Sequence, residues 1–358
     1  TSPLLESIQP LQLGGANSPL PQQQRSLQSG GNLSWSKDSK KLYWTLGPDL
    51  YSQTLSATSG AEPASSYIGL LQESSKPQGK IALIGGRILT MVDDQVIEDG
   101  AVIIDGDRIA AVGPRRDLPI PEGAVIFDIK GATLMPGLID ARARAEQGVA
   151  GLIPQQNWRN LAHLAFGVTS IFDHATDGSS LFAASELQKR GAIIAPRLFA
   201  SGDLLSGNSD AQPAVTINSL AAAERYAQRQ KKQGAFSIIS AQLPRRDQRQ
   251  QLIAAARLHN LMVVAAGGGS LPHSLSLIAD GYTSLEQAPP QAQLYADVQQ
   301  FMAGSGVAYT PVLNDATGGL SGASYWYHQS DLGNHPRHGP QEPRPAQLPY
   351  KQRTNSAT

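Results

Sequence analysis

Two arginines follow an apolar segment at alternate positions. Arg142 and Arg144 come directly after Gly-Leu-Ile-Asp in "LMPGLIDARARAEQG", residues 134–148. Positions two apart in a strand point the same way, so histidines there could share one divalent cation that acidifies a bound water. Arginine stays protonated and has no lone pair to donate. The pair therefore indicates a cationic site suited to a carboxylate or phosphate, or a structural pair with acidic neighbours such as Asp140, Asp173 or Glu286.

A histidine between carboxylates is the second candidate. Asp173, His174 and Asp177 follow the apolar run "VTSIFD". A histidine beside carboxylates can act as a general base or a weak metal ligand. Loop polarity and capping of the next helix explain the same residues, and both interpretations stay open.

Three further segments carry possible binding chemistry. Arg245, Arg246 and Arg249 in "PRRDQRQ" could join Arg142 and Arg144 in a cationic mouth, or hold loops by salt bridges. The glycine-rich segment 265–274 could cradle an anion with backbone N–H groups or form a turn. "SYWYH" and "NHPRH" could contact sugar or metal, or belong to a polar tail.

Composition limits the classes of function. Lys+Arg and Asp+Glu each number 29 in 358 residues, so no overall charge attracts nucleic acid. The chain contains no cysteine, which excludes thiolate ligands and disulfides. No stretch of about 20 apolar residues predicts a membrane span. We expect neither a nucleic-acid nor a membrane partner, and the N-terminal segment shows no signal-peptide pattern.

Alternating strand and helix patterns predict the positions of these residues. From residue 133 onward, seven apolar strand-like runs are separated by Ala-rich helical stretches, which predicts an α/β fold with a parallel sheet, closing as a (β/α)8 barrel. Seven runs leave this barrel incomplete. The predicted strands are "TLMPGLID", "VTSIFD", "PRLFASG", "FSIISA", "LMVVAA", "YTSLEQ" and "AYTPVL".

The N-terminal third has strand patterns separated by turns. "LSWSKDSKKLYWTLGPDLYSQTL" alternates around Lys37-Asp38-Ser39 and predicts a β-hairpin, and the Ile/Val-rich runs of residues 80–113 predict a small antiparallel β-sandwich. The predicted units are a hairpin region at 1–55, a linker at 56–79, a sandwich at 80–138, a partial barrel at 139–315 and an irregular tail at 316–358.

Residues 80 to about 315 resemble the amidohydrolase superfamily. "GGRILTMVDDQVIEDGAVIIDGDRIAAVG" resembles half of its sandwich domain, and "GATLMPGLIDARAR" resembles its entry into the barrel. The hairpin, with "PQQNW", "FAASELQ" and "APRLFASG", resembles a propeller-linked, imidazolonepropionase-like group of exported bacterial proteins. The resemblance implies a remnant propeller blade, a periplasmic or secreted location, and hydrolysis of non-peptide C–N bonds with zinc or another divalent metal. It also implies that this chain is a truncated member.

The ligand positions implied by the resemblance carry the wrong side chains. They are Arg142, Arg144, Ile239, Ala266 and Gln287. We therefore expect no metal cofactor and a catalytically impaired member, whose barrel supports binding or structure. Two alternatives stay open: a metal-dependent amidohydrolase with ligands such as His174 and His273, and an anion-binding module built on the arginines. Another copy or a related subunit is expected to complete the barrel.

Overall fold

The computed structural model describes most of the chain before residue 313. The described residues are 23, 25, 26, 28, 30–57, 61–75, 77–148, 152–174, 178–206, 217–241, 243–267, 269–287, 289, 291 and 293–312. Asp177 and the predicted tail at 316–358 lie outside them. The chain divides into two compact units, residues 1–70 and residues 71–358.

The first unit contains a four-stranded antiparallel sheet of order β1-β2-β3-β4. The predicted strand, turn and strand are present, and the turn is closed by a hydrogen bond from Ser36 N to Lys41 O of 3.0 Å. Trp44 stacks on Tyr51 in a small buried cluster. Part of the predicted linker at 56–79 forms β4, because its backbone satisfies the free edge of β3. The strands are β1 (Gly31–Trp35), β2 (Lys41–Leu46), β3 (Asp49–Thr54) and β4 (Ala64–Tyr67).

The second unit begins with one mixed sheet of order β7-β6-β5-β8, with β9 also pairing with β5. The described residues of this region form one mixed sheet, and the predicted antiparallel sandwich stays a prediction. β8 and β9 run parallel to β5, because the chain crosses over after β7 through a single 3-10 turn. The elements are β5 (Lys80–Leu89), β6 (Val96–Asp105), β7 (Arg108–Pro114), η1 (Arg115–Asp117), β8 (Val125–Asp128) and β9 (Thr133–Leu134).

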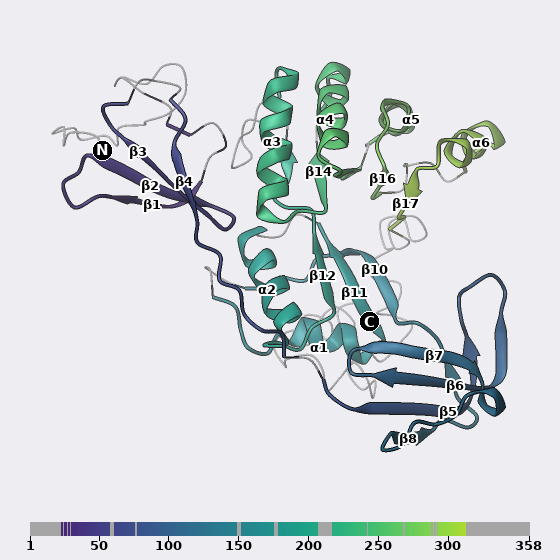
Figure 1. Ribbon diagram of the computed structural model, residues 1–358. Helices are drawn as coiled ribbons and strands as arrows, with labels where there is room; N and C mark the ends of the chain where they lie inside the picture. The colour runs from purple at the N-terminus through teal and green to yellow at the C-terminus, as the bar shows by residue number, and fades with distance from the viewer. Residues whose placement is uncertain are drawn as a thin grey trace, which may run out of the picture. The chain divides into compact units, whose positions relative to one another are not determined.

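Parallel strands joined by helices form the rest of this unit (Figure 1). β10, β11 and β12 make one sheet, and β13 to β17 make a second, both in chain order. The predicted run "TLMPGLID" is divided at Pro136, so that β9 pairs with β5 and only β10 joins the parallel strands. The strands are β10 (Leu138–Ala143), β11 (Val168–Asp173), β12 (Arg197–Ala200), β13 (Leu205–Ser206), β14 (Ser237–Ala241), β15 (Met262–Ala265), β16 (Ser284–Leu285) and β17 (Ala308–Tyr309).

The helices pack apolar side chains against these strands. The larger core cluster joins α3, α4 and α5 to β14 and β15, and a smaller cluster joins α2 to β11 and β12. α3 and α4 lie side by side (Figure 1). The helices are α1 (Trp158–Ala165), α2 (Gly178–Arg190), α3 (Leu220–Gln233), α4 (Arg246–Leu258), α5 (Leu271–Asp280) and α6 (Ala296–Ser305).

The third strand-like run connects the two parallel sheets. β12, from this run, pairs with β11, whereas β13, which follows the run, pairs with β14. A backbone hydrogen bond from Phe236 N to Ala200 O of 2.9 Å joins the sheets between these strands. The order of the runs matches the prediction, and closure into a barrel stays a prediction.

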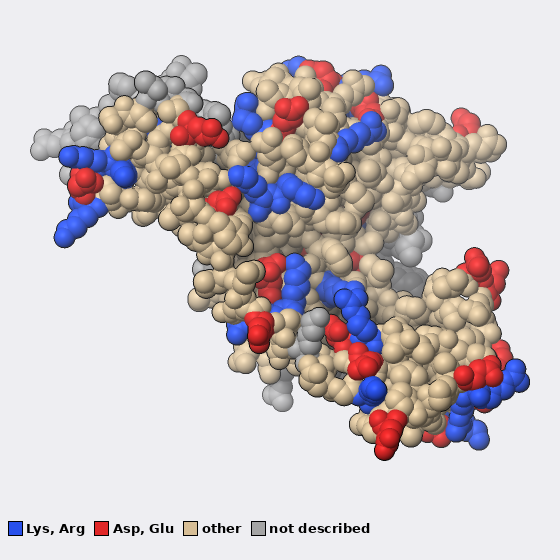
Figure 2. All heavy atoms as spheres, in the orientation of Figure 1, with Lys and Arg blue, Asp and Glu red and all other residues tan. Residues whose placement is uncertain are grey.

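Among the described residues, no helix combines the length and apolarity needed to cross a bilayer. On the face drawn in Figure 2, the described basic and acidic side chains are interspersed.

Candidate functional site

The candidate site lies at the carboxyl ends of β10, β11 and β16. Arg142 and Arg144 belong to the end of β10, Asp173 and His174 to the end of β11, and Glu286 follows β16. Because the strands are parallel, their carboxyl ends gather these side chains at one edge, as the strand pattern predicts.

Arg142 is held by an ion pair with Glu286. The Arg142 Nε atom lies 3.7 Å from Glu286 Oε2, and the two side chains are 22% and 3% exposed. The backbone N–H of Arg142 donates to Asp140 Oδ1 at 2.9 Å, which shapes the end of β10. The expected pairing of Arg142 with an acidic neighbour is therefore present, with Glu286 as its partner.

Arg144 differs from Arg142 in its surroundings. It directly follows β10, and its side chain is exposed. It makes no hydrogen bond or ion pair with the part of the chain that the structure describes. The charge of Arg144 is therefore surrounded by solvent. Around Arg142, the carboxylate of Glu286 takes the place of part of the solvent.

Glu286 is a buried carboxyl group, and the described residues offset the cost of burying its charge only in part. Burial raises the pKa of Glu286, while a hydrogen bond from Ser284 and the charge of Arg142 act in the opposite direction. Ser284 Oγ donates to Glu286 Oε1 at 3.0 Å. Glu286 Oε2 accepts no hydrogen bond from the described residues, and the guanidinium of Arg142 is the positive charge that lies near it.

His174 lies beside this pair as a buried neutral ring. Its Nε2 atom is 2.9 Å from Ala141 O and 3.6 Å from Glu286 Oε2. Burial lowers the pKa of His174, the bond to Ala141 raises it, and the charges of Arg142 and Arg144 lower it further. At neutral pH the ring is therefore uncharged, with Nε2–H donating to Ala141 O and Nδ1 left as an acceptor.

Asp173 supports the backbone after β10. Its side chain is fully buried, and its Oδ2 accepts a hydrogen bond from Ala145 N at 2.8 Å. With His174 only 2% exposed, neither residue of the predicted acid–base pair faces the solvent among the described atoms. The structure places both residues at the strand ends, and their roles as catalytic groups stay predictions.

A second histidine–carboxylate pair was not predicted from the sequence. His163 of α1 lies with its Nε2 atom 3.6 Å from Asp140 Oδ2, and its Nδ1 atom 2.7 Å from Arg159 O. The interaction with Asp140 raises the pKa of His163 and lowers the pKa of Asp140. The amphipathic pattern of "NWRNLAHLAF" could have placed His163 on the strand-facing side, but it could not identify its partner.

The remaining positions implied by the family resemblance do not suit a divalent metal. Ile239 is a buried apolar side chain of β14, and Ala266 has no donor atom. Gln287 is exposed, and its side chain lies where a Cβ atom on Gly267 would be. In the described part of the chain, no three His, Asp or Glu side chains gather closely enough to hold a metal ion. The guanidinium of Arg142, which lies beside Glu286, supplies no lone pair for zinc.

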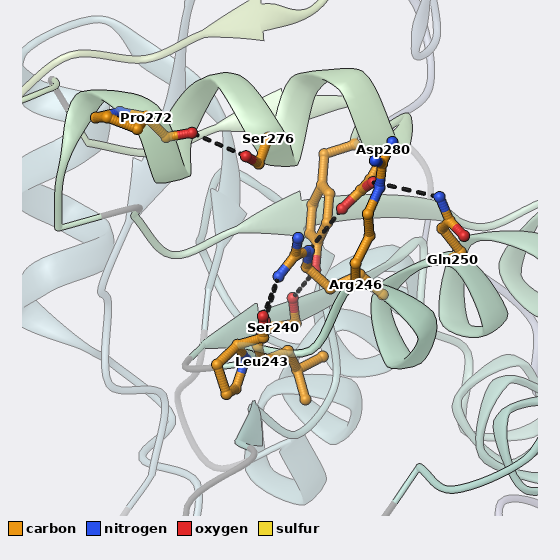
Figure 3. Close-up of polar contacts among 10 residues, drawn as sticks. Ser240, Leu243, Arg246, Gln250, Pro272, Ser276 and Asp280 are labelled. Atoms are coloured by element: carbon orange, nitrogen blue, oxygen red, sulfur yellow. Dashed lines mark hydrogen bonds and ion pairs between the residues drawn. The ribbon is translucent and has the colours of Figure 1, made fainter.

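The arginines after β14 form separate contacts. Arg246 Nε and Arg249 Nε each donate to the buried Asp280 of α5 at 2.7 Å, as Figure 3 illustrates for Arg246. Arg245 pairs with Asp247 on the surface. These contacts match the alternative in which the arginines hold loops, and none of them joins Arg245 or Arg246 to Arg142 in the described structure.

The glycine-rich segment leads into α5. Ser270 caps this helix by accepting from His273 N at 3.4 Å, and Gly267 and Gly269 have φ of 120° and 67°, which favours glycine. Burial lowers the pKa of His273, whose charged neighbours are Arg249 and Asp280. A turn and helix cap therefore account for this segment, and its use as an anion cradle stays a prediction.

Sequence comparisons find similar segments in metabolic enzymes. A scan against protein-family models finds no match. The chain is 43% identical over 53 residues to an imidazolonepropionase of Pseudomonas aeruginosa (strain UCBPP-PA14), covering 15% of this chain and 13% of the relative. It is 31% identical over 118 residues to the imidazolonepropionase of Sphingopyxis alaskensis, covering 30% and 29%. It is 41% identical over 84 residues to a 5-methylthioadenosine/S-adenosylhomocysteine deaminase of Nitratidesulfovibrio vulgaris (strain DP4), covering 21% and 19%. These matches span less than a third of each relative.

Solved structures resemble the fold over a longer range. Phenylurea hydrolase B has a TM-score of 0.55 at 15% identity, covering 78% of this chain and 73% of that chain. A Xaa-Pro dipeptidase with bound methionine has a TM-score of 0.54 at 15% identity, covering 78% and 75%. At these identities the likeness concerns the fold alone.

Proposed function

We propose that the chain is a non-catalytic member of the amidohydrolase superfamily that uses the fold for binding or structural support, a proposal supported by the similar segments and the shared fold. The observation that supports this proposal is the ion pair of Arg142 with Glu286 at the carboxyl ends of the strands. A permanent cation occupies the place where the family resemblance implies a metal. It neutralises the buried carboxylate without supplying a Lewis acid.

The three charged or titratable groups form an electrically balanced cluster. Arg142 carries one positive charge, which balances Glu286 in its ionised form, and His174 is neutral since its pKa is lowered. A divalent ion added beside Glu286 would meet the guanidinium of Arg142 at short range, and this repulsion opposes metal binding. The neutral His174 ring already uses its Nε2–H on Ala141 O, which leaves only Nδ1 as a donor of electrons.

Metal analysis tests this proposal. The protein is incubated with zinc, dialysed, and measured by elemental mass spectrometry, with His174→Ala as a matched variant. We expect zinc well below one ion per chain in both proteins. One zinc per chain, removed by a chelator together with an amide-hydrolysing activity, would overturn the proposal. Loss of that zinc in His174→Ala would instead support the alternative enzyme with unusual ligands.

The finer architecture forms part of the same proposal. We propose that β10 to β17 are the larger part of a (β/α)8 barrel, and that β5 to β9 are part of a sandwich domain. We further propose that the four-stranded sheet of β1 to β4 is a propeller blade. The sequential parallel order and the family resemblance support this assignment.

Partner and location follow from the resemblance as further proposals. Another copy or a related subunit would cover the edges of β10 and β17 that no described strand pairs with, since exposed edges favour pairing. Light scattering after size-exclusion chromatography tests this, and a strictly monomeric protein would contradict it. A periplasmic or secreted location is tested by fractionating cells that express the full reading frame.

A further inference from the structure

A pocket of 780 Å³ lies away from the carboxyl-end cluster. Its walls come from segments that precede the strands, namely Ile193 to Ala195 before β12, Gly234 to Phe236 before β14, and Asn260 before β15. The helix residues in its walls extend from Phe182 to Lys189 along α2 and include Lys231 near the end of α3. The pocket therefore opens at the amino ends of the strands, opposite to Arg142, His174 and Glu286.

The split between the two parallel sheets creates this space. β12 and β13 are consecutive strands along the chain, but they pair with different neighbours, β11 and β14. Between them only the bond from Phe236 N to Ala200 O connects the sheets among the described pairings. Side chains that would pack against each other across a continuous sheet instead line the pocket, which we call the aromatic slot.

Aromatic rings form the apolar part of the slot. Phe182, Phe199 and Phe236 line it, and Phe199 and Phe236 are 43% and 46% exposed. Their ring centroids are 5.7 Å apart and tilted, and Phe236 meets Phe172 edge to face at 5.5 Å. Rings held in this way offer a flat ligand both faces and edges. Neighbouring exposed phenylalanines in one pocket are a feature of ligand or partner sites.

Positive charge surrounds this aromatic slot. The charged lining residues are Lys189, Arg197, Lys231 and Asp107, three cations against one carboxylate. Lys189 already pairs with Glu186. Arg197 and Lys231 are exposed and form no hydrogen bond or ion pair with the described residues. Two cations are therefore available to an anion in the slot.

One wall of the pocket is fixed before any ligand arrives. The segment Ser74–Ser75 is tied to the last turn of α2, where Ser74 Oγ donates to Lys189 O and Ser75 N donates to Arg190 O, both at 2.8 Å. These bonds satisfy carbonyl groups at the helix end. Because this wall is already ordered, less conformational entropy is lost when a ligand binds.

We propose that this pocket binds an aromatic carboxylate, with the ring against Phe199 and Phe236 and the carboxylate against Arg197 and Lys231. The pocket volume lies within the range of small-molecule sites, about 300–1,000 Å³, and its mixture of apolar walls with a few charged groups is typical of them. Arginine pairs with a carboxylate through two parallel N–H groups, which gives the anion a preferred position.

The proposal is tested by calorimetric titration with cinnamate. Cinnamamide has the same ring and length without the charge, and octanoate has the charge without the ring. We expect cinnamate to bind about ten-fold more tightly than either, the difference expected from one charge-assisted contact or one ring contact. Equal affinity for cinnamamide would overturn the role of the cations, and equal affinity for octanoate would overturn the role of the rings.

Variants locate the binding. Arg197→Gln and Phe236→Ala change exposed side chains, so their folding is checked by circular dichroism, and each is expected to weaken cinnamate binding about ten-fold. Arg144→Gln removes an exposed arginine at the opposite strand ends, and Ile109→Ala changes a separate apolar groove on β5, β6 and β7. Both controls are expected to bind cinnamate unchanged. Absence of saturable binding, or loss of binding in the controls alone, would overturn the assignment.

Discussion

Replacing Arg142 by methionine tests whether this guanidinium compensates the buried Glu286. Methionine keeps the apolar stem of arginine and removes its charge. Removing one partner of a buried ion pair costs about 3–5 kcal/mol, because the other charge remains uncompensated. Arg142 keeps part of its contact with water and lies 3.7 Å from Glu286 Oε2. We therefore expect Arg142→Met to lower the free energy of unfolding by about 2–3 kcal/mol at neutral pH.

The loss should depend on pH in a defined direction. Burial raises the pKa of Glu286 above its unfolded value, so the folded state retains the proton more readily than the unfolded state. Stability therefore falls as pH rises from the unfolded pKa through the folded pKa. Without Arg142 the folded pKa rises further, and the penalty should be largest at neutral pH and disappear in acid.

Urea unfolding followed by circular dichroism measures this effect. Arg142→Lys is the matched control that retains the charge, and Arg144→Met removes an exposed charge, for which we expect a change within about 0.5 kcal/mol. The double variant Arg142→Met/Glu286→Gln should recover most of the lost stability, because no buried charge then remains. A loss in Arg142→Met no larger than in Arg144→Met, or additive effects in the double variant, would refute the reasoning.

Two further ion pairs give predictions of their own. His163→Gln should lower stability by about 0.5–1 kcal/mol. The loss should be fully present between about pH 4 and 6.5, because the raised pKa of His163 and the lowered pKa of Asp140 bound that window. Denaturant titration across pH checks it, and a pH-independent difference would contradict the ion pair. Asp280→Asn should cost about 3–5 kcal/mol, since Asp280 is fully buried and Arg249 nearly so. A thermal melt measures it, with Arg246→Gln as the milder variant, and an unchanged melt would contradict the assigned contacts.

The sequence predicted the order of the parallel strands because each run is apolar and bounded by turns. "VTSIFD" and "FSIISA" became β11 and β14 close to their expected limits. The predictions failed where one run contained two strands. "TLMPGLID" divides at Pro136, which cannot donate to a ladder, and β9 then pairs with β5. Periodicity alone gives no information on which sheet a short strand will join.

The site was predicted in part. Placing Arg142 and Glu286 near each other required only that parallel strands end at one edge, and the structure has this pair. Placing Arg246 required its partner Asp280, which lies 34 residues further along the chain on another helix. No local pattern in "PRRDQRQ" identifies that partner. The pocket at the amino ends was also beyond sequence analysis, since it arises from the divided pairing of β12 and β13.

Arg142 and a divalent ion are alternative answers to the same electrostatic problem. Glu286 is buried at the strand ends and needs a positive neighbour to stay ionised. A metal would meet this need and add two charges, one of which would have to be balanced by further carboxylates. Arginine meets it with one charge and leaves His174 free to remain neutral. If Arg142 holds the place of a metal as proposed, Arg142→His alone would not create a metal site, because Ile239 and Ala266 would still offer no ligand atoms.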